Sequence, residues 1–215
     1  MTIRHHLEEH TLLAYATGDL PEAFNLIIAA HVSLCDQCRA TVESLDALGG
    51  AVMNGTAAAE MPEDSLARTL AQLDALPLEP RARTHSAGKS ALPAPLRDYV
   101  GGDLEAVRWR RVGMGVKQAI LPTSKAASAR LLLIPAGVQM PDHSHSGTEL
   151  TLVLQGAFRD GDECFARGDI EVADGSVSHM PVAEAGADCI CLAVTDAPLR
   201  FKGWLPRIAQ KFLRI

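Results

Sequence analysis

The chain has 215 residues, enough for one large domain or two small ones, each with a modest hydrophobic core. Its net charge of −6 is uneven, because residues 1–76 hold 11 acidic residues against 3 basic ones and the remainder is slightly basic. An acidic segment is a poor nucleic-acid ligand, which argues against direct nucleic-acid binding and favours a basic protein surface as partner. A merely solvated acidic face is the alternative.

Targeting and disulfide signals are absent from the sequence. No apolar run reaches the roughly 20 residues that a membrane span needs, and the N-terminal residues lack the apolar core of a signal peptide. Five cysteines, an odd number, argue against a disulfide framework. These features predict a cytoplasmic protein without a membrane partner.

Residues 1–76 are predicted to form four helices, which span 7–17, 21–31, 36–48 and 64–73. Glycines at position 18 and at positions 49–50 are expected to end the first and third helices. In the second helix, apolar residues recur at i, i+3, i+4 and i+7, and this pattern places His31 on the buried side.

The fourth helix carries Leu66, Leu70 and Leu73 along one face. This face either closes the helical bundle or docks on a partner protein. Docking is favoured, because the first three helices already enclose the metal-binding motif described next.

The motif His31-x-x-x-Cys35-x-x-Cys38 lies at the junction of the second and third predicted helices. Imidazole nitrogen and thiolate sulfur at this spacing suit tetrahedral zinc. The alternatives are a buried core histidine and a redox-active cysteine pair, and the combination favours zinc. A fourth ligand is expected from the N-terminal histidines His5, His6 and His10.

The N-terminal sequence MTIRHH, followed by HxxxCxxC, resembles the zinc-binding anti-sigma factor family. The resemblance implies that His6, His31, Cys35 and Cys38 bind zinc, with His5 as an open alternative to His6. It further implies that the four helices form an anti-sigma domain. Such a domain binds a group IV extracytoplasmic-function sigma factor as a 1:1 heterodimer and blocks RNA polymerase.

Residues 77–95 are predicted to be a linker, because they are rich in Pro, Ala, Arg and Ser and show no periodicity. Short β-type runs follow over residues 96–215, for example at 130–134, 149–154, 169–172 and 189–194. The predicted fold class is therefore multidomain α + β, in which a helical zinc-binding domain precedes an antiparallel jelly-roll domain.

The run Gly137-x5-His143-x-His145-x3-Glu149-x6-Gly156 resembles the first cupin motif, and His179 stands at the interval of the second. Strand alternation places His143 and His145 on the same face of a sheet. By the resemblance, His143, His145, Glu149 and His179 form a mixed nitrogen and oxygen site for zinc, iron or manganese. Two metal ions per chain are expected, both zinc or the second another divalent metal.

Metal cupins include enzymes such as dioxygenases, in which an open coordination position binds substrate or oxygen. A metal-free cupin is a further alternative. Because the helical domain resembles anti-sigma factors, the cupin is interpreted as a sensor without catalytic residues. The resemblance implies that singlet oxygen or oxidative stress, acting through this domain, releases the sigma factor.

Cys189 and Cys191 face one side of a predicted strand. Two small buried core residues are the favoured interpretation. Thiols that register oxidation are the alternative.

Overall fold

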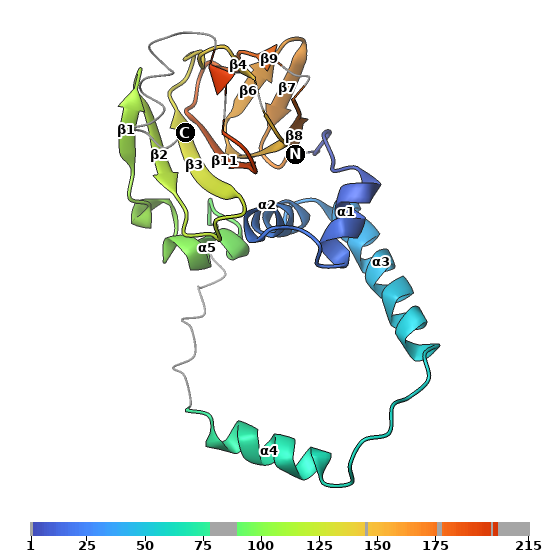
Figure 1. The fold of residues 1–215 in the computed structure, drawn as a ribbon. Helices are drawn as coiled ribbons and strands as arrows, with labels where there is room; N and C mark the ends of the chain where they lie inside the picture. The colour runs from blue at the N-terminus through green and yellow to red at the C-terminus, as the bar shows by residue number, and fades with distance from the viewer. Residues whose placement is uncertain (1, 78–89, 145, 176–177, 199, 202–215) are drawn as a thin grey trace.

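The computed structural model describes residues 2–77, 90–144, 146–175, 178–198 and 200–201 (Figure 1). Four helices lie within residues 1–76, as the sequence predicts, and an antiparallel β region follows after a fifth helix and a short 3-10 helix. The helices are α1 (Glu9–Ala16), α2 (Glu22–Val32), α3 (Asp36–Asn54), α4 (Ser65–Ala75) and α5 (Ala94–Val100), with a short 3-10 helix η1 (Leu104–Ala106) after them. No helix in the described ranges combines the length and the apolar character that crossing a membrane requires.

The strands are short, and their bounds are β1 (Arg110–Gly113), β2 (Val116–Ile120), β3 (Ser128–Ile134), β4 (His143–Ser144), β5 (Glu149–Gln155), β6 (Ala157–Asp160), β7 (Glu163–Ala166), β8 (Ile170–Ala173), β9 (Ser178–His179), β10 (Val182–Ala183), β11 (Cys189–Thr195) and β12 (Arg200–Phe201). The four β runs expected from the sequence correspond to β3, β5, β8 and β11.

Helix ends follow the sequence in one case and depart from it in another. Gly18 follows α1 with φ near +75°, a left-handed conformation that glycine adopts without strain, so this predicted end is confirmed. The predicted end of α3 at Gly49 and Gly50 is wrong, because the helix continues to Asn54. Neither glycine has a positive φ, so the backbone stays helical at a cost of about 1 kcal/mol per glycine.

The main sheet has six strands in the order β1-β2-β3-β11-β5-β8, all antiparallel. Two three-stranded sheets, β10-β6-β7 and β12-β4-β9, complete the jelly-roll. Every residue of the central strand β11 is buried. This strand is therefore covered on both faces, which explains its unbroken apolar sequence.

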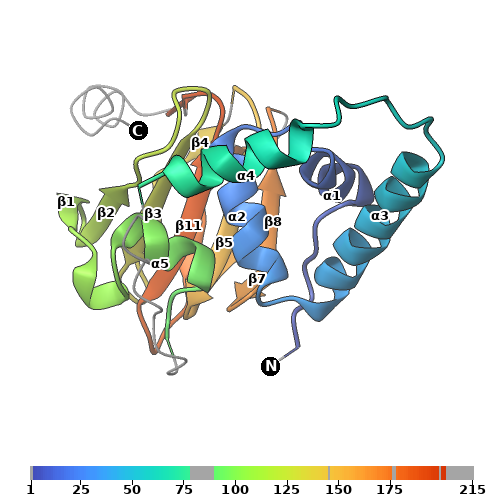
Figure 2. The ribbon, with the colours of Figure 1, turned by 90° about the horizontal axis from the view of Figure 1, so that it is seen from below.

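Helix α2 covers one face of the main sheet, as the view from below shows (Figure 2). One hydrophobic core joins side chains of α2, such as Ile27 and Ile28, to sheet residues such as Leu131 and Leu192. Each large aliphatic side chain fully buried in this way contributes ~1.5–3 kcal/mol to folding. The helical region and the β region thus share a core.

The last part of the predicted linker also enters this core. Leu92 is buried, and α5 begins at Ala94. Residues 78–89 lie outside the described part of the chain.

A second, smaller core fills the inside of the jelly-roll, and includes Phe158, Phe165, Cys189 and Cys191. Alternation along β11 sends Ile190 and Leu192 toward α2 and the two cysteines into this interior.

The C-terminal half of α3 and all of α4 extend away from both cores (Figure 1). Large apolar side chains on these helices are exposed, namely Leu48, Val52, Met53, Leu66, Leu70 and Leu73. The four helices therefore do not form a closed bundle, and α4 does not cover the first three.

Candidate metal centres

The structure brings His6, His31, Cys35 and Cys38 together in an N-terminal cluster whose four ligand atoms lie within 4.8 Å of one another. His31 Nε2 is 3.3 Å from Cys38 Sγ, and Cys35 Sγ is 3.2 Å from His6 Nδ1. Ligand atoms around tetrahedral zinc lie ~3.5 Å apart, given bonds of ~2.0–2.3 Å. The donor set and its spacing therefore fit zinc.

Local structure explains why three of these residues converge. His31 lies in the last turn of α2, and its carbonyl accepts hydrogen bonds from the backbone N–H groups of Leu34 and Cys35. This turn leads directly to Cys35, the N-cap of α3, whose Sγ accepts from the Cys38 backbone N–H at 3.5 Å. The tight connection leaves His31, Cys35 and Cys38 on the inside of the corner.

The fourth member comes from the segment before α1, and its geometry distinguishes the N-terminal histidines. The His6 ring lies in the cluster. The His5 ring instead lies 4.2 Å from the Phe165 ring, with Nδ1 3.6 Å from Asp169 Oδ2. His10 is exposed beside Glu8. Of the three candidates, only His6 has its ring in the cluster.

Burial favours the neutral forms of His31 and Cys38 when no metal is bound. It lowers the pKa of His31 to about 4 and raises the pKa of the Cys38 thiol to about 11. A neutral imidazole is the form that binds a metal, whereas the thiol must lose its proton. Zinc uptake here is therefore coupled to proton release.

A second group, the cupin cluster, consists of His143, Glu149 and His179, with ligand atoms again within 4.8 Å of one another. His143 on β4 pairs with His179 on β9 in the sheet register, and their Nε2 atoms are 3.1 Å apart. His145, the fourth predicted member, lies outside the described residues.

Hydrogen bonds orient both histidines of the cupin cluster. His143 Nδ1 donates to the Pro141 carbonyl at 2.8 Å, and His179 Nδ1 lies 2.8 Å from Asp160 Oδ2. With Nδ1 engaged, the two rings point their Nε2 atoms toward each other, and an engaged Nδ1 is typical of metal-binding histidines. The residues present therefore fit a divalent metal.

Burial and neighbouring charged groups shift the pKa values of Glu149 and His179 in the cupin cluster. Burial raises the pKa of Glu149 to about 7. Burial alone lowers the pKa of His179, but the contacts with Glu171 and Asp160 outweigh it and raise that pKa to about 9. Asp160 and Glu171 were not predicted from the sequence. The only signal for Glu171 was a charged residue inside an otherwise apolar strand.

Cys189 and Cys191 are buried near this cluster. The pKa of the Cys191 thiol is raised well above its ordinary value by a hydrogen bond with Cys189, by burial, and by the nearby Glu149 and Glu171 carboxyls. A protonated, enclosed thiol packs as a small apolar residue. Their oxidation-sensing role stays a prediction.

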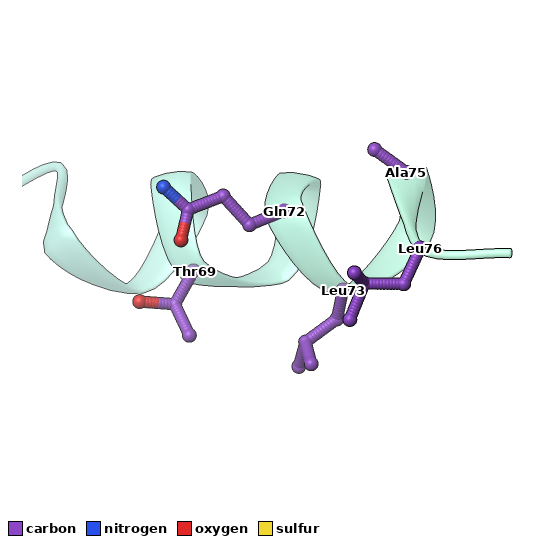
Figure 3. Close-up of a pocket in the computed structure, with 5 residues that line it drawn as sticks. All are labelled: Thr69, Gln72, Leu73, Ala75 and Leu76. Carbon is purple, nitrogen blue, oxygen red and sulfur yellow. The ribbon is translucent and has the colours of Figure 1, made fainter.

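Leu66, Leu70 and Leu73 lie along the exposed face of α4, between 51% and 71% accessible to solvent. A shallow hollow at the end of this helix is lined by residues of α4 and its C-cap Leu76 (Figure 3). In the close-up, Thr69 and Leu73 project from the same side. No other described element covers this face.

The fold and the two clusters define a class of protein, in which a helical region with a cluster of two cysteines and two histidines packs on a cupin. A family model described as "ChrR Cupin-like domain" matches residues 98–198. Over all 215 residues, and over 100% of both chains, this chain is 57% identical to the anti-sigma-E factor ChrR of Cereibacter sphaeroides. The chain belongs to the ChrR family of anti-sigma-E factors.

A solved structure agrees with this assignment. In the crystal structure of Rhodobacter sphaeroides SigE in complex with the anti-sigma ChrR, one chain is 55% identical to this one, with a TM-score of 0.80. The match covers 91% of this chain and 100% of that chain. Family membership makes this chain a regulatory protein, and the alternative of a metal-dependent cupin enzyme is dropped.

Proposed function

We propose that this protein binds an extracytoplasmic-function sigma factor of the SigE type in a 1:1 complex and withholds it from RNA polymerase in the cytoplasm. The observation that carries the proposal is the full-length match to ChrR, whose solved structure is a complex with SigE. The exposed apolar face of α4 supports it, because contiguous exposed leucines mark a protein-binding surface.

The docking surface is proposed to be the Leu66, Leu70 and Leu73 face of α4. The acidic charge of residues 1–76 complements the basic surfaces with which a sigma factor contacts DNA. Apolar anchors supply most of the binding energy in such a complex, and charge speeds the encounter.

The N-terminal cluster is proposed to hold a structural zinc ion through His6, His31, Cys35 and Cys38. Its four donors are all protein side chains, which leaves no position for a substrate. When bound, zinc would fix the segment before α1 to the corner between α2 and α3. The inhibitory surface then depends on this metal.

The cupin cluster is proposed to hold a second zinc ion, or another divalent metal, through His143, Glu149, His179 and the predicted ligand His145. We assign it a sensory role, in which singlet oxygen or a related oxidative stress alters this part of the chain and releases the sigma factor. Under this proposal, residues 1–76 bind the sigma factor and residues 96–215 respond to the stress.

The test is co-expression of the full chain with candidate SigE-type sigma factors of the same organism. We expect a co-purifying 1:1 complex and repression of the cognate promoter in a reporter strain. Exposure to singlet oxygen should then restore promoter activity. If no candidate sigma factor co-purifies or is repressed, the proposal is wrong.

A further inference from the structure

The cupin contacts the N-terminal cluster through the turn between β7 and β8 (residues 167–169). The Gly168 carbonyl accepts a hydrogen bond from His31 Nδ1 at 3.0 Å, across 137 positions of sequence. Because His31 is fully buried and Nδ1 is engaged, Nε2 is the nitrogen that faces Cys38 Sγ. A hydrogen bond of this kind fixes both the ring orientation and the tautomer of a metal-binding histidine.

The next residue of the turn holds the segment that carries His6. One carboxylate oxygen of Asp169 accepts hydrogen bonds from the backbone N–H groups of Arg4 at 2.7 Å and His5 at 3.0 Å. Its other oxygen accepts from the Ala166 backbone N–H at 2.8 Å, within the turn itself. The Asp169 side chain is 2% exposed, so water does not compete for these bonds.

The turn also requires glycine at position 168. Gly168 has φ near +91°, and a Cβ atom there would lie 2.6 Å from Ile3 Cδ1. Ile3 therefore packs directly over the turn, three residues before His6. The segment before α1 is held by backbone hydrogen bonds on one side and by this close contact on the other.

We infer that the β7–β8 turn of the cupin positions His31 and His6, so that the N-terminal metal site is assembled from both regions of the chain. Gly168 and Asp169 are positioning residues, since neither supplies a ligand atom. This inference rests on the proposed zinc occupancy of the cluster. It makes metal retention at the inhibitory end of the chain dependent on the cupin.

The experiment uses the full chain loaded with Co²⁺, because a thiolate-to-cobalt charge-transfer band reports the cysteine-containing site separately from the cupin site. Asp169→Ala removes both carboxylate oxygens, and Asp169→Asn keeps only one. Asp103→Ala is the matched control, because Asp103 accepts three backbone N–H bonds and one from Ser90 inside the cupin region, far from the cluster in sequence.

We expect Asp169→Ala to speed cobalt transfer to a chelator by about 10–100-fold and to shift the charge-transfer band, with a smaller effect for Asp169→Asn. Asp103→Ala should lower thermal stability and leave both readouts unchanged. Should Asp169→Ala fail to fold, Gly168→Ala disturbs the same turn, and Ile3→Ala in that background should partly restore slow release.

Two results would overturn the inference in different ways. An unchanged band and release rate in Asp169→Ala, with a normal band in the wild type, refutes the positioning role alone. A wild-type chain without any thiolate-to-cobalt band refutes the zinc proposal and this inference with it.

Discussion

His143 and His179 lie opposite each other on the paired strands β4 and β9, with their Nε2 atoms 3.1 Å apart. Two imidazoles this close, with Glu149 beside them, form a donor set that fits a shared divalent cation. The pair sits inside the jelly-roll, whereas the exposed face of α4 lies on a separate helix. Metal binding at this pair and sigma binding at α4 are therefore open to separate tests.

His143→Ala and Glu149→Ala are each expected to remove about one metal ion per chain and to leave the complex with the sigma factor intact. The reason is that both side chains belong to the cupin cluster and neither touches α4. Metal content measured by elemental analysis and co-purification with the sigma factor check the two halves of the prediction. Release of the sigma factor by singlet oxygen should be lost.

Glu163→Ala is a suitable control for the cupin variants, because Glu163 is an exposed carboxylate on the neighbouring strand β7. It should behave as the wild type in metal content, binding and release. If His143→Ala instead abolishes sigma binding, the two functions are not separable along the chain.

Cys35→Ala and Cys38→Ala should each abolish zinc binding at the N-terminal cluster and, with it, sigma binding. Structural zinc contributes on the order of 10 kcal/mol of folding free energy in small zinc domains, so its loss should loosen the corner between α2 and α3. Zinc content and a pull-down with the sigma factor measure the effect. Cys164→Ala, which removes a half-buried cysteine on β7, is the control. Retained sigma binding in the zinc-free variants would show that the metal is not structural.

The candidate metal ligands could be predicted from the sequence where they lie close together along the chain. Residues three to seven positions apart across a helix junction have nearly fixed relative positions, as His31, Cys35 and Cys38 do. Asp160 and Glu171 could not be predicted, because they reach His179 from strands whose pairing no local period encodes.

The packing of α2 on the main sheet could not be predicted from the sequence either. Its apolar periodicity indicates that one face is buried but not what buries it. The structure packs Ile27 and Ile28 in one core with the main sheet. The choice between a helical bundle and a sheet depends on which complementary apolar surface the whole chain provides.

Replacing Leu66, Leu70 and Leu73 together by Ser should weaken sigma binding without lowering the stability of the free chain. Exposed side chains contribute within about 0.5 kcal/mol to folding, whereas each apolar anchor of an interface contributes more than ~1 kcal/mol to binding. Titration calorimetry and urea unfolding separate the two effects. Leu13→Ser, an exposed leucine on α1, is the matched control. Equal affinities of the triple variant and the wild type would exclude α4 as the docking surface.

Acid should destabilise the fold through Asp103. Burial alone raises the pKa of this carboxyl, but hydrogen bonds from Ser90 and three backbone N–H groups outweigh it and lower the pKa below its ordinary 3.8. Because the folded-state pKa is below the unfolded-state value, the carboxylate stabilises the fold above about pH 4. This contribution is lost as the pH falls through the folded-state pKa.

Asp103→Asn should therefore lower the free energy of unfolding by about 1–3 kcal/mol at pH 7, with the difference from wild type closing below pH 4. Urea unfolding at a series of pH values measures it, and both proteins lose any bound metal alike. Asp162→Asn, at an exposed turn residue, is the control and should unfold at the same urea concentration as the wild type at pH 7. If the free energy of unfolding of Asp103→Asn stays below that of the wild type in acid, Asp103 stabilises the fold through its shape and not through its charge.

Strand β8 connects the two clusters over a few residues, and this connection predicts that they influence each other. Gly168 and Asp169 contact the N-terminal cluster and the segment that carries His6. Glu171, two positions after Asp169, lies 3.7 Å from His179 Nδ1.

Removing the cupin metal should shift Glu171 and His179 together and thereby disturb the turn. We expect His143→Ala to release the N-terminal metal a few-fold faster than the wild type does. Because thermodynamic coupling between binding sites is reciprocal, Cys35→Ala should in turn weaken metal binding at the cupin. Equal release rates in His143→Ala and wild type would show that β8 carries no such coupling, and that the signal for sigma release takes another route.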